Sequence, residues 1–271
     1  MMCLVRVTLL LCLASISAAP KAAAQLATRL APRNAEADAA TYERCLRLAK
    51  QDPVAAQKLA LAWQGRGGKH PAAHCAAIAL IGLKQYKEAA TRLEALAQAM
   101  TMAPMSLRAE VLDQAGQAWG LAGDAARAYA AARAAVALLP NDPDLLIDRA
   151  EAAASAGYVG QAVEDLDRVL KDDPGRVDAL VYRASANRAL DRLDRALADI
   201  EQALARAPDS APALLERGNI RRLKGDDAGA RQDWERVGQL APGSQADMAA
   251  KANLERLRAS DTAPTISRPN P

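Results

Sequence analysis

The fold is decided by the stretch from Pro174 to Pro208, which reads PGRVDALVYRASANRALDRLDRALADIEQALARAP. Its two terminal prolines lie 34 residues apart. The same interval relates four prolines of the chain: Pro140, Pro174, Pro208 and Pro242. A fixed period of about 20 to 50 residues indicates stacked copies of one small structural unit. We therefore place four repeats in phase over residues 109–244 and number the positions within each repeat from 1 to 34.

Small residues recur at two positions of the repeat. Position eight holds Gly116, Ala150, Ala184 and Gly218, and position twenty holds Ala128, Ala162, Ala196 and Ala230. Position four carries a leucine in every repeat: Leu112, Leu146, Leu180 and Leu214. Small side chains let two helix backbones approach closely, because a bulky side chain at the contact would separate them. Each repeat is therefore predicted to form an antiparallel pair of helices.

The repeat also specifies where its helices begin and end. Position fifteen holds Gly123, Gly157, Asp191 and Gly225. Glycine there suits the left-handed conformation that ends a helix, and aspartate tolerates it. The proline ends the second helix, because the residue before a proline is forced out of the helical region. The predicted N-caps of the following helices are Asp142, Ser210 and Ser244, with Pro143 in the favoured first helical position.

This pattern resembles the tetratricopeptide repeat (TPR) family. The motif of that family has leucine or tryptophan at position four, glycine or alanine at eight, alanine at twenty and proline at thirty-two. The resemblance implies an all-α fold, a right-handed superhelical solenoid of antiparallel helix hairpins with about four regular and one or two irregular repeats. One departure concerns position eleven, where the usual aromatic residue survives only as Trp119.

The chain is expected to consist of seven segments. We predict a signal peptide over 1–24, a linker over 25–35, irregular helical hairpins over 36–103, a second linker over 104–108, the regular repeats over 109–244, a C-terminal capping helix over 245–259 and a disordered tail over 260–271. Arg6, the apolar run 7–19 and the small residues at 22–24 are typical of a Sec-type signal peptide. The chain is thus expected to be exported to the periplasm. An uncleaved anchor is the alternative.

Composition and charge narrow the choice of partners. Hydrophobic residues make up 51% and charged residues 25% of the chain, which is enough apolar material for a folded core. Removal of residues 1–24 takes away Arg6 and Lys21, so 33 basic residues face 32 acidic ones. A near-neutral chain without a basic stripe argues against a nucleic-acid or anionic-membrane partner. Beyond the signal, no apolar stretch reaches the ~20 residues of a spanning helix, so no direct membrane insertion is expected.

Opposite charges recur at two further positions. Position seven is Arg149, Arg183 and Arg217 in three repeats, and position twenty-three is Asp165, Asp199 and Asp233 in the same three. In the first regular repeat both positions are alanine, Ala115 and Ala131. We predict an ion pair that joins the two helices of each of the three repeats.

Two cysteines, Cys45 and Cys75, remain after signal removal, and export favours a disulfide between them. Buried free thiols are the alternative. His70 and His74 lie four residues apart next to Cys75 and could with Cys45 ligate a metal. The intervening Pro71 and the absence of a carboxylate cluster disfavour this, so we expect no metal and no cofactor.

The sequence contains no catalytic arrangement that we can recognise. It has two histidines, no glycine-rich phosphate loop after a strand and no serine at a strand-to-helix elbow. We therefore expect a protein without enzymatic activity.

The resemblance places the binding surface on the concave face, which the first helix of each repeat lines. Positions two, five, six, nine and twelve point into this groove in the TPR family. The corresponding residues here are Asp113, Gln117, Asp144, Asp148, Glu151, Asp178, Tyr182, Ser185, Arg188, Glu216, Asn219 and Arg222. They lack the Lys/Asn/Arg combination with which family members bind a peptide C-terminal carboxylate.

Another protein or peptide is the expected partner of this groove, in a scaffold or assembly factor of the cell envelope. The alternative is a self-associating structural protein, a homo-oligomer that stacks through the ends of its repeat array. A solvated groove without a ligand would carry the same residues.

Overall fold

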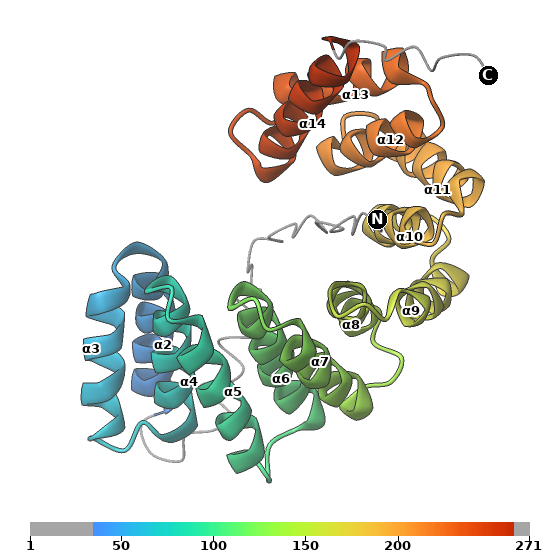
Figure 1. The fold of residues 1–271 in the computed structure, drawn as a ribbon. Helices are drawn as coiled ribbons and strands as arrows, with labels where there is room; N and C mark the ends of the chain where they lie inside the picture. Colours follow the sequence, from blue (N-terminus) through green and yellow to red (C-terminus); the bar gives the residue numbers. More distant parts are fainter. Residues whose placement is uncertain (1–34, 263–271) are drawn as a thin grey trace, which may run out of the picture. The chain divides into compact units, whose positions relative to one another are not determined.

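The computed structural model describes residues 35–262, and all of the regular structure in that range is α-helical (Figure 1). The predicted all-α fold is confirmed. The predicted signal peptide, nearly all of the first linker and the tail from residue 263 lie outside the described residues. Among the described helices, none combines the length and the hydrophobicity that a membrane span requires.

The chain divides into two compact units, which we describe separately. The N-terminal unit runs to Tyr158 and contains α2 (Ala35–Gln51), α3 (Pro53–Gln64), α4 (Lys69–Gly82), α5 (Tyr86–Ala99), α6 (Met105–Leu121), α7 (Ala125–Leu138) and α8 (Pro143–Ser155). The C-terminal unit begins at Val159 and contains α9 (Val159–Asp172), α10 (Val177–Ala189), α11 (Leu193–Arg206), α12 (Ala211–Leu223), α13 (Asp227–Leu240) and α14 (Gln245–Thr262).

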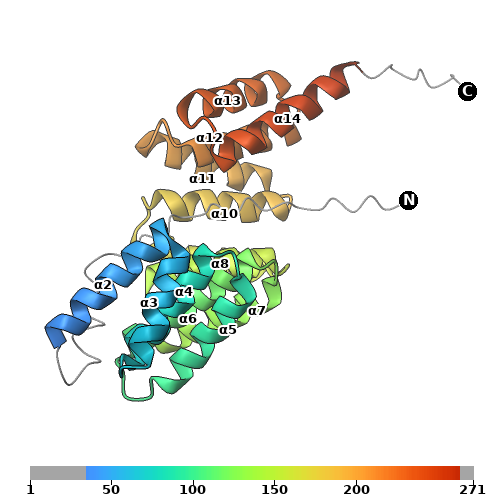
Figure 2. The same ribbon diagram turned by 90° about the vertical axis from the view of Figure 1, so that its left-hand side faces the viewer.

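In the N-terminal unit, consecutive helices from α2 to α8 pack against one another; Figure 1 shows α4 to α7 side by side in chain order, and Figure 2 views the same unit from the side of α2 and α3. The Asp52 side chain caps α3 by accepting from the Ala55 N–H, and Pro53 begins that helix. A disulfide joins Cys45 on α2 to Cys75 on α4, with their Cα atoms 6.1 Å apart. Both cysteines are fully buried. The irregular N-terminal region is therefore built, like the regular repeats, from consecutive helices that pack on one another, and a disulfide joins two of them.

Two helices extend beyond their expected bounds. α6 begins at Met105, so residues 105–108 form its first turn and are not a linker. Pro104 precedes the helix, and Leu107 within the added turn packs on the hydrophobic core. The apolar contact explains why the helix starts early. α14 continues to Thr262, three residues past the predicted end.

In the C-terminal unit, α10 packs on α11, α12 on α13 and α13 on α14. The small residues at positions eight and twenty are buried at these contacts: Ala184, Ala196, Gly218 and Ala230. The Ser210 hydroxyl caps α12, and the Ser244 hydroxyl accepts from the Asp247 N–H at the start of α14. In the N-terminal unit the Asp142 side chain likewise caps α8. The three predicted N-caps are confirmed.

The backbone at position fifteen is left-handed in every repeat. The φ angles are 77° at Gly123, 88° at Gly157, 58° at Asp191 and 83° at Gly225. Lys84 lies one helix hairpin further upstream and has a φ of 60°. The turn between the paired helices is thus conserved in conformation even where its residue is not glycine.

Two of the predicted ion pairs form. Arg183 binds both carboxylate oxygens of Asp199, through Nη2 at 2.6 Å and Nε at 3.0 Å. Arg217 binds Asp233 in the same way, at 2.6 and 2.9 Å. Asp199 and Asp233 are buried, and bidentate bonds from an arginine satisfy their charge. Arg149 and Asp165 belong to different units, and their pairing stays a prediction.

We expect Gly218→Ala to destabilise the C-terminal unit. An added Cβ would lie 2.5 Å from Nε1 of Trp234, so the indole ring would have to move, at about 1–3 kcal/mol. Gly116→Ala, at the same repeat position, is the control, because its nearest new contact is the Ala128 carbonyl oxygen at 3.2 Å. Urea unfolding followed by circular dichroism measures both. Equal losses of stability in the two variants would contradict the packing argument.

We expect a double-mutant cycle on Arg183 and Asp199 to give a coupling energy of about 1–2 kcal/mol, above the typical value for exposed pairs, because the pair is bidentate and sheltered. Their side chains are 23% and 9% exposed. The exposed pair Glu88–Arg92 on α5 is the matched control. The cycle isolates the pairwise energy from the second bond of Arg183 to Asp167. A coupling no larger than that of the control would refute the role of the pair.

Candidate protein-binding surface

In the N-terminal unit, three predicted groove residues come together between α6 and α8. Gln117 Nε2 donates to Oδ2 of Asp113 at 2.9 Å and, at 3.4 Å, to Oδ2 of Asp148. Asp144 lies exposed in the first turn of α8, and Glu151 lies half-buried further along the same helix. The five predicted residues of this unit thus line neighbouring first helices, and four of them are acidic.

Burial and neighbouring negative charges raise the free-energy cost of ionising Asp113 in this cluster. The pKa of Asp113 is raised well above its usual value, first by burial and then by the charge of Asp148 and of Glu110. Burial also raises the pKa of Glu110. A cationic group placed here would relieve the repulsion.

In the C-terminal unit, predicted groove residues on α10 and α12 form one hydrogen-bonded chain with two residues of α14. Arg188 makes a bidentate ion pair with Glu216 and contacts the Ser185 hydroxyl. Asn219 Nδ2 donates to Glu216 Oε2 at 3.1 Å. We call the chain the polar row; its members are Ser185, Arg188, Glu216, Asn219, Asn253 and Arg256.

The polar row continues from α12 to α14 through amides. Asn253 Nδ2 donates to Asn219 Oδ1 at 2.8 Å, and Arg256 Nη1 donates to Asn253 Oδ1 at 2.8 Å. α12 packs directly on both α10 and α14, which places the three helices side by side. The polar row therefore crosses α10, α12 and α14, which are the first helices of successive hairpins.

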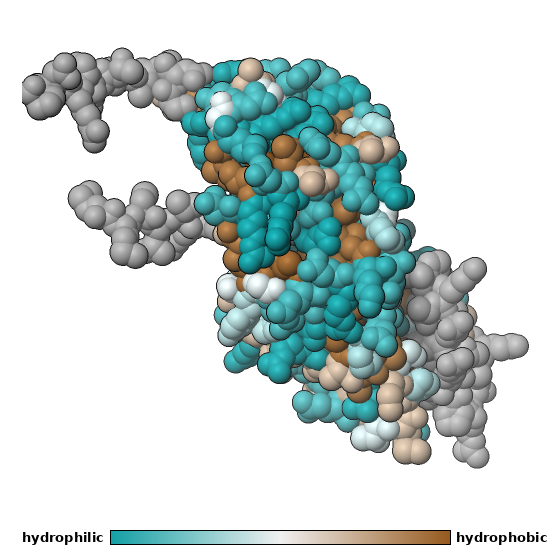
Figure 3. All heavy atoms as spheres, turned by 90° about the vertical axis from the view of Figure 1, so that its right-hand side faces the viewer, coloured by the Kyte–Doolittle hydropathy of each residue, from teal (hydrophilic) through white to brown (hydrophobic). Residues whose placement is uncertain are grey.

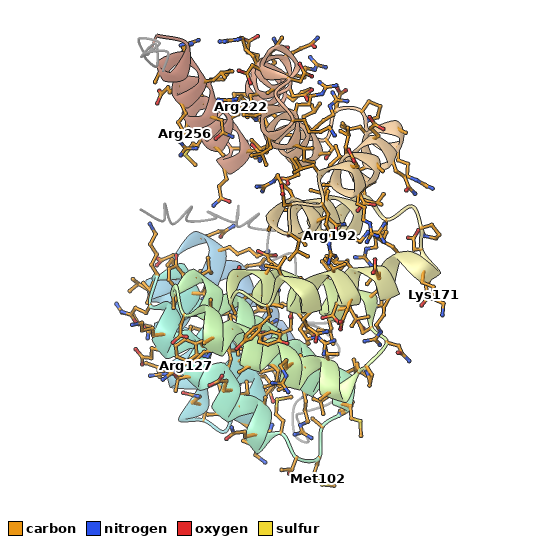
Figure 4. The ribbon with its side chains drawn as sticks, turned by 45° about the vertical axis from the view of Figure 1, so that its right-hand side comes forward. Met102, Arg127, Lys171, Arg192, Arg222 and Arg256 are labelled. Atoms are coloured by element: carbon orange, nitrogen blue, oxygen red, sulfur yellow. A yellow bond between two sulfur atoms is a disulfide. The ribbon has the colours of Figure 1, made fainter. Side chains whose placement is uncertain are left out.

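The remaining predicted residues of the C-terminal unit lie on α10 and α12. Arg222 near the end of α12 pairs with Asp227 at the start of α13. Asp178 pairs with Arg176 at the start of α10, and Tyr182 is half-buried on the same helix. Figure 4 shows Arg222 and Arg256 on the neighbouring helices α12 and α14.

The sequence prediction omitted Asn253 and Arg256 because α14 was interpreted as a cap. The 34-residue period could nevertheless have identified them, since Asn253 and Arg256 lie 34 positions after Asn219 and Arg222. The prediction also omitted Glu110. This residue stands at position two, which is one of the groove positions, in the repeat that follows the irregular region.

His74, Cys45 and Cys75 take no part in this surface. His74 is buried between the Tyr42 hydroxyl, 2.6 Å from Nδ1, and the Gln114 amide oxygen, 2.5 Å from Nε2. Burial lowers the pKa of His74. Both ring nitrogens of His74 have protein partners, and Cys45 is in the disulfide, so the alternative of a metal held by His70, His74 and Cys45 does not fit the geometry.

Comparison with known proteins links this geometry to a fold. No family model and no curated protein matches the chain. Among solved structures, a TPR protein from Parabacteroides merdae aligns with a TM-score of 0.64 at 14% identity, covering 83% of this chain and 94% of its own. A thermophilic TPR protein from Thermus thermophilus aligns with a TM-score of 0.56 at 18% identity, covering 70% and 99%.

The chain has the TPR fold. A third TPR protein, YrrB, which is described as having an unusual peptide-binding site, aligns with a TM-score of 0.50 at 15% identity and covers 72% of this chain and 96% of its own. At these identities the likeness concerns the TPR fold, and the residues of the polar row have to be argued from this chain alone.

We expect Asp113→Asn to stabilise the N-terminal unit at pH 7. A raised folded pKa means that the folded state binds the Asp113 proton more tightly than the unfolded state, so this group lowers stability as the pH rises from about 4 through its folded pKa. The gain from the amide should therefore shrink as the pH falls toward 4. Urea unfolding at pH 7 and pH 4.5 measures it.

Asp144→Asn on α8 is the control, because it removes one negative charge at an exposed position of the same surface. An Asp113→Asn variant that is equally stabilised at both pH values, or destabilised at pH 7, would show that burial and repulsion do not govern this carboxylate.

Proposed function

We propose that this chain is a non-enzymatic scaffold or assembly factor of the cell envelope that binds an extended segment of another protein across the first helices of its repeats. The observation that carries the proposal is the polar row, which lines up donors and acceptors from α10, α12 and α14. Guanidinium and amide groups are suited to the carboxylate and main-chain groups of a peptide.

The chemistry of the polar row favours binding over catalysis. Its groups are arginines, amides, one hydroxyl and one carboxylate that an arginine already neutralises. Covalent catalysis requires a nucleophile beside a base, and Ser185 contacts Arg188, which cannot accept a proton. Figure 3 shows the face at the right-hand side of Figure 1, where hydrophilic side chains predominate and hydrophobic ones lie in groups between them.

The envelope location is supported by two features of the N-terminal region. Residues 1–24 have the pattern of a signal peptide, and Cys45 and Cys75 form a buried disulfide. Disulfides persist in oxidising compartments such as the periplasm.

Self-association is a second candidate function, and one observation favours it. Met248 on α14 stands at the position of the repeat leucine, 34 residues after Leu214, yet its side chain is 59% exposed. In the repeats Leu146, Leu180 and Leu214 are buried at this position, and no helix follows α14 among the described residues. A second copy of the chain could cover this face.

We expect a photo-crosslinking residue at Asp144 or Asp178 to capture a partner protein in envelope extract. Both positions are exposed on first helices. Glu164 and Glu201, exposed on the second helices α9 and α11, are matched controls and should capture little. Adducts from the second helices alone would contradict the proposal. Adducts between two copies of this chain, with concentration-dependent growth in light scattering, would establish the self-association candidate in its place.

A further inference from the structure

An arginine recurs once per repeat on the first helices of the C-terminal unit. Position twelve holds Arg188 on α10, Arg222 on α12 and Arg256 on α14, each 34 residues after the last. Position nine of the same helices holds Ser185, Asn219 and Asn253. In the N-terminal unit position twelve is Gly120 on α6 and Ala154 on α8, so the arginine column is specific to the C-terminal unit.

From α10 to α14, the arginines of this column are neutralised less and less by carboxylates. Arg188 is bound by Glu216, and the two side chains are only 18% and 7% exposed. Arg222 pairs with Asp227, where the side chains are 42% and 43% exposed and water weakens the attraction. Arg256 donates to the amide oxygen of Asn253 and pairs with no carboxylate among residues 37–259, whose side chains the structure describes. Arg222 and Arg256 therefore offer positive charge to a ligand.

The spacing of the arginines defines the shape of that ligand. Directly packed helices lie about 8–10 Å apart, and α10, α12 and α14 pack in this order. A polyproline II segment has three residues per turn and rises about 3.1 Å per residue, so every third side chain returns to the same side after about 9 Å. Carboxylates on every third residue would match successive arginines.

Resting on the proposed function, we propose that the arginine column binds an acidic, extended segment of a partner protein in which Asp or Glu recurs at every third residue in a polyproline II conformation. Nη2 and Nε of Arg222 remain available beside its bond to Asp227, which uses Nη1. The amides of Asn219 and Asn253 hold the neighbouring helices in register at the same level. The ligand is recognised by its side-chain carboxylates, so a free C-terminus is not required.

The test uses the full chain and three fluorescein-labelled peptides with blocked ends. One carries three glutamates separated by pairs of prolines, the second carries the same residues with the glutamates adjacent, and the third replaces the glutamates of the first by lysines. Fluorescence anisotropy should show the first peptide binding about tenfold or more tightly than the second, because adjacent carboxylates reach only one arginine. Any binding of the lysine peptide, for instance to the acidic residues of the N-terminal unit, should be unchanged in the variant Arg222→Gln/Arg256→Gln.

The variant Arg222→Gln/Arg256→Gln should weaken binding of the first peptide about tenfold or more, because two charge-assisted contacts are lost. The matched control is Arg195→Gln/Arg236→Gln, which removes the same charge from exposed positions on the second helices α11 and α13 and should leave binding unchanged. Salt should weaken binding to the unaltered protein more than to the first variant. Should that variant not fold, the comparison of peptides on the unaltered protein still decides the matter.

Equal binding of the spaced and adjacent glutamates, or equal losses in the two variants, would overturn the inference. Crosslinking from Asp178 separates this result from a failure of the proposed function. If a partner is captured there while the spaced peptide does not bind, the scaffold role stands and the acidic ligand is wrong. If neither is observed, both are wrong.

Discussion

The close approach of paired helices through glycine and alanine is the constraint on which the rest of this structure depends. A Cβ atom added at Gly116 would lie 3.2 Å from the carbonyl oxygen of Ala128 on the paired helix. At such a distance side chains larger than methyl cannot be accommodated, so the small residues fix which faces of the two helices meet. Once these faces are fixed, the position of every other side chain in the repeat follows from its number in the 34-residue period.

The same constraint explains how the charge of a buried aspartate finds a partner. With small residues at the contact, the arginine at position seven reaches the aspartate at position twenty-three of the paired helix, as Arg217 reaches Asp233. Asp233 is 2% exposed and would be costly without this partner. In the first regular repeat both positions are alanine and both are buried, so that hairpin packs without an ion pair at these two positions. The pairs therefore specify the register of particular hairpins and are not required for the fold.

Much of this architecture follows from the sequence, because the repeat encodes local features. The N-caps at Asp142 and Ser210, the left-handed Asp191 and the Arg183–Asp199 pair each depend on residues close in sequence or within one hairpin. Contacts between repeats depend on how hairpins stack, which the motif does not encode. Hence the bonds of Arg188 to Glu216 and of Asn253 to Asn219 were not foreseen, although the four residues stand at periodic positions. The early start of α6 was likewise set by packing of Leu107.

The polar row has two consequences that act together. Its hydrogen bonds tie α10, α12 and α14 to one another, and they also restrict the rotamers of the side chains that face solvent. An arginine that is free in solution loses about 2 kcal/mol of rotamer entropy when it is immobilised by a ligand. Arg256, already bonded to Asn253, has lost part of that freedom on folding. Less binding energy is then spent on ordering such a side chain, so a row that holds three helices in register is also preorganised for the ligand that we propose to lie across them.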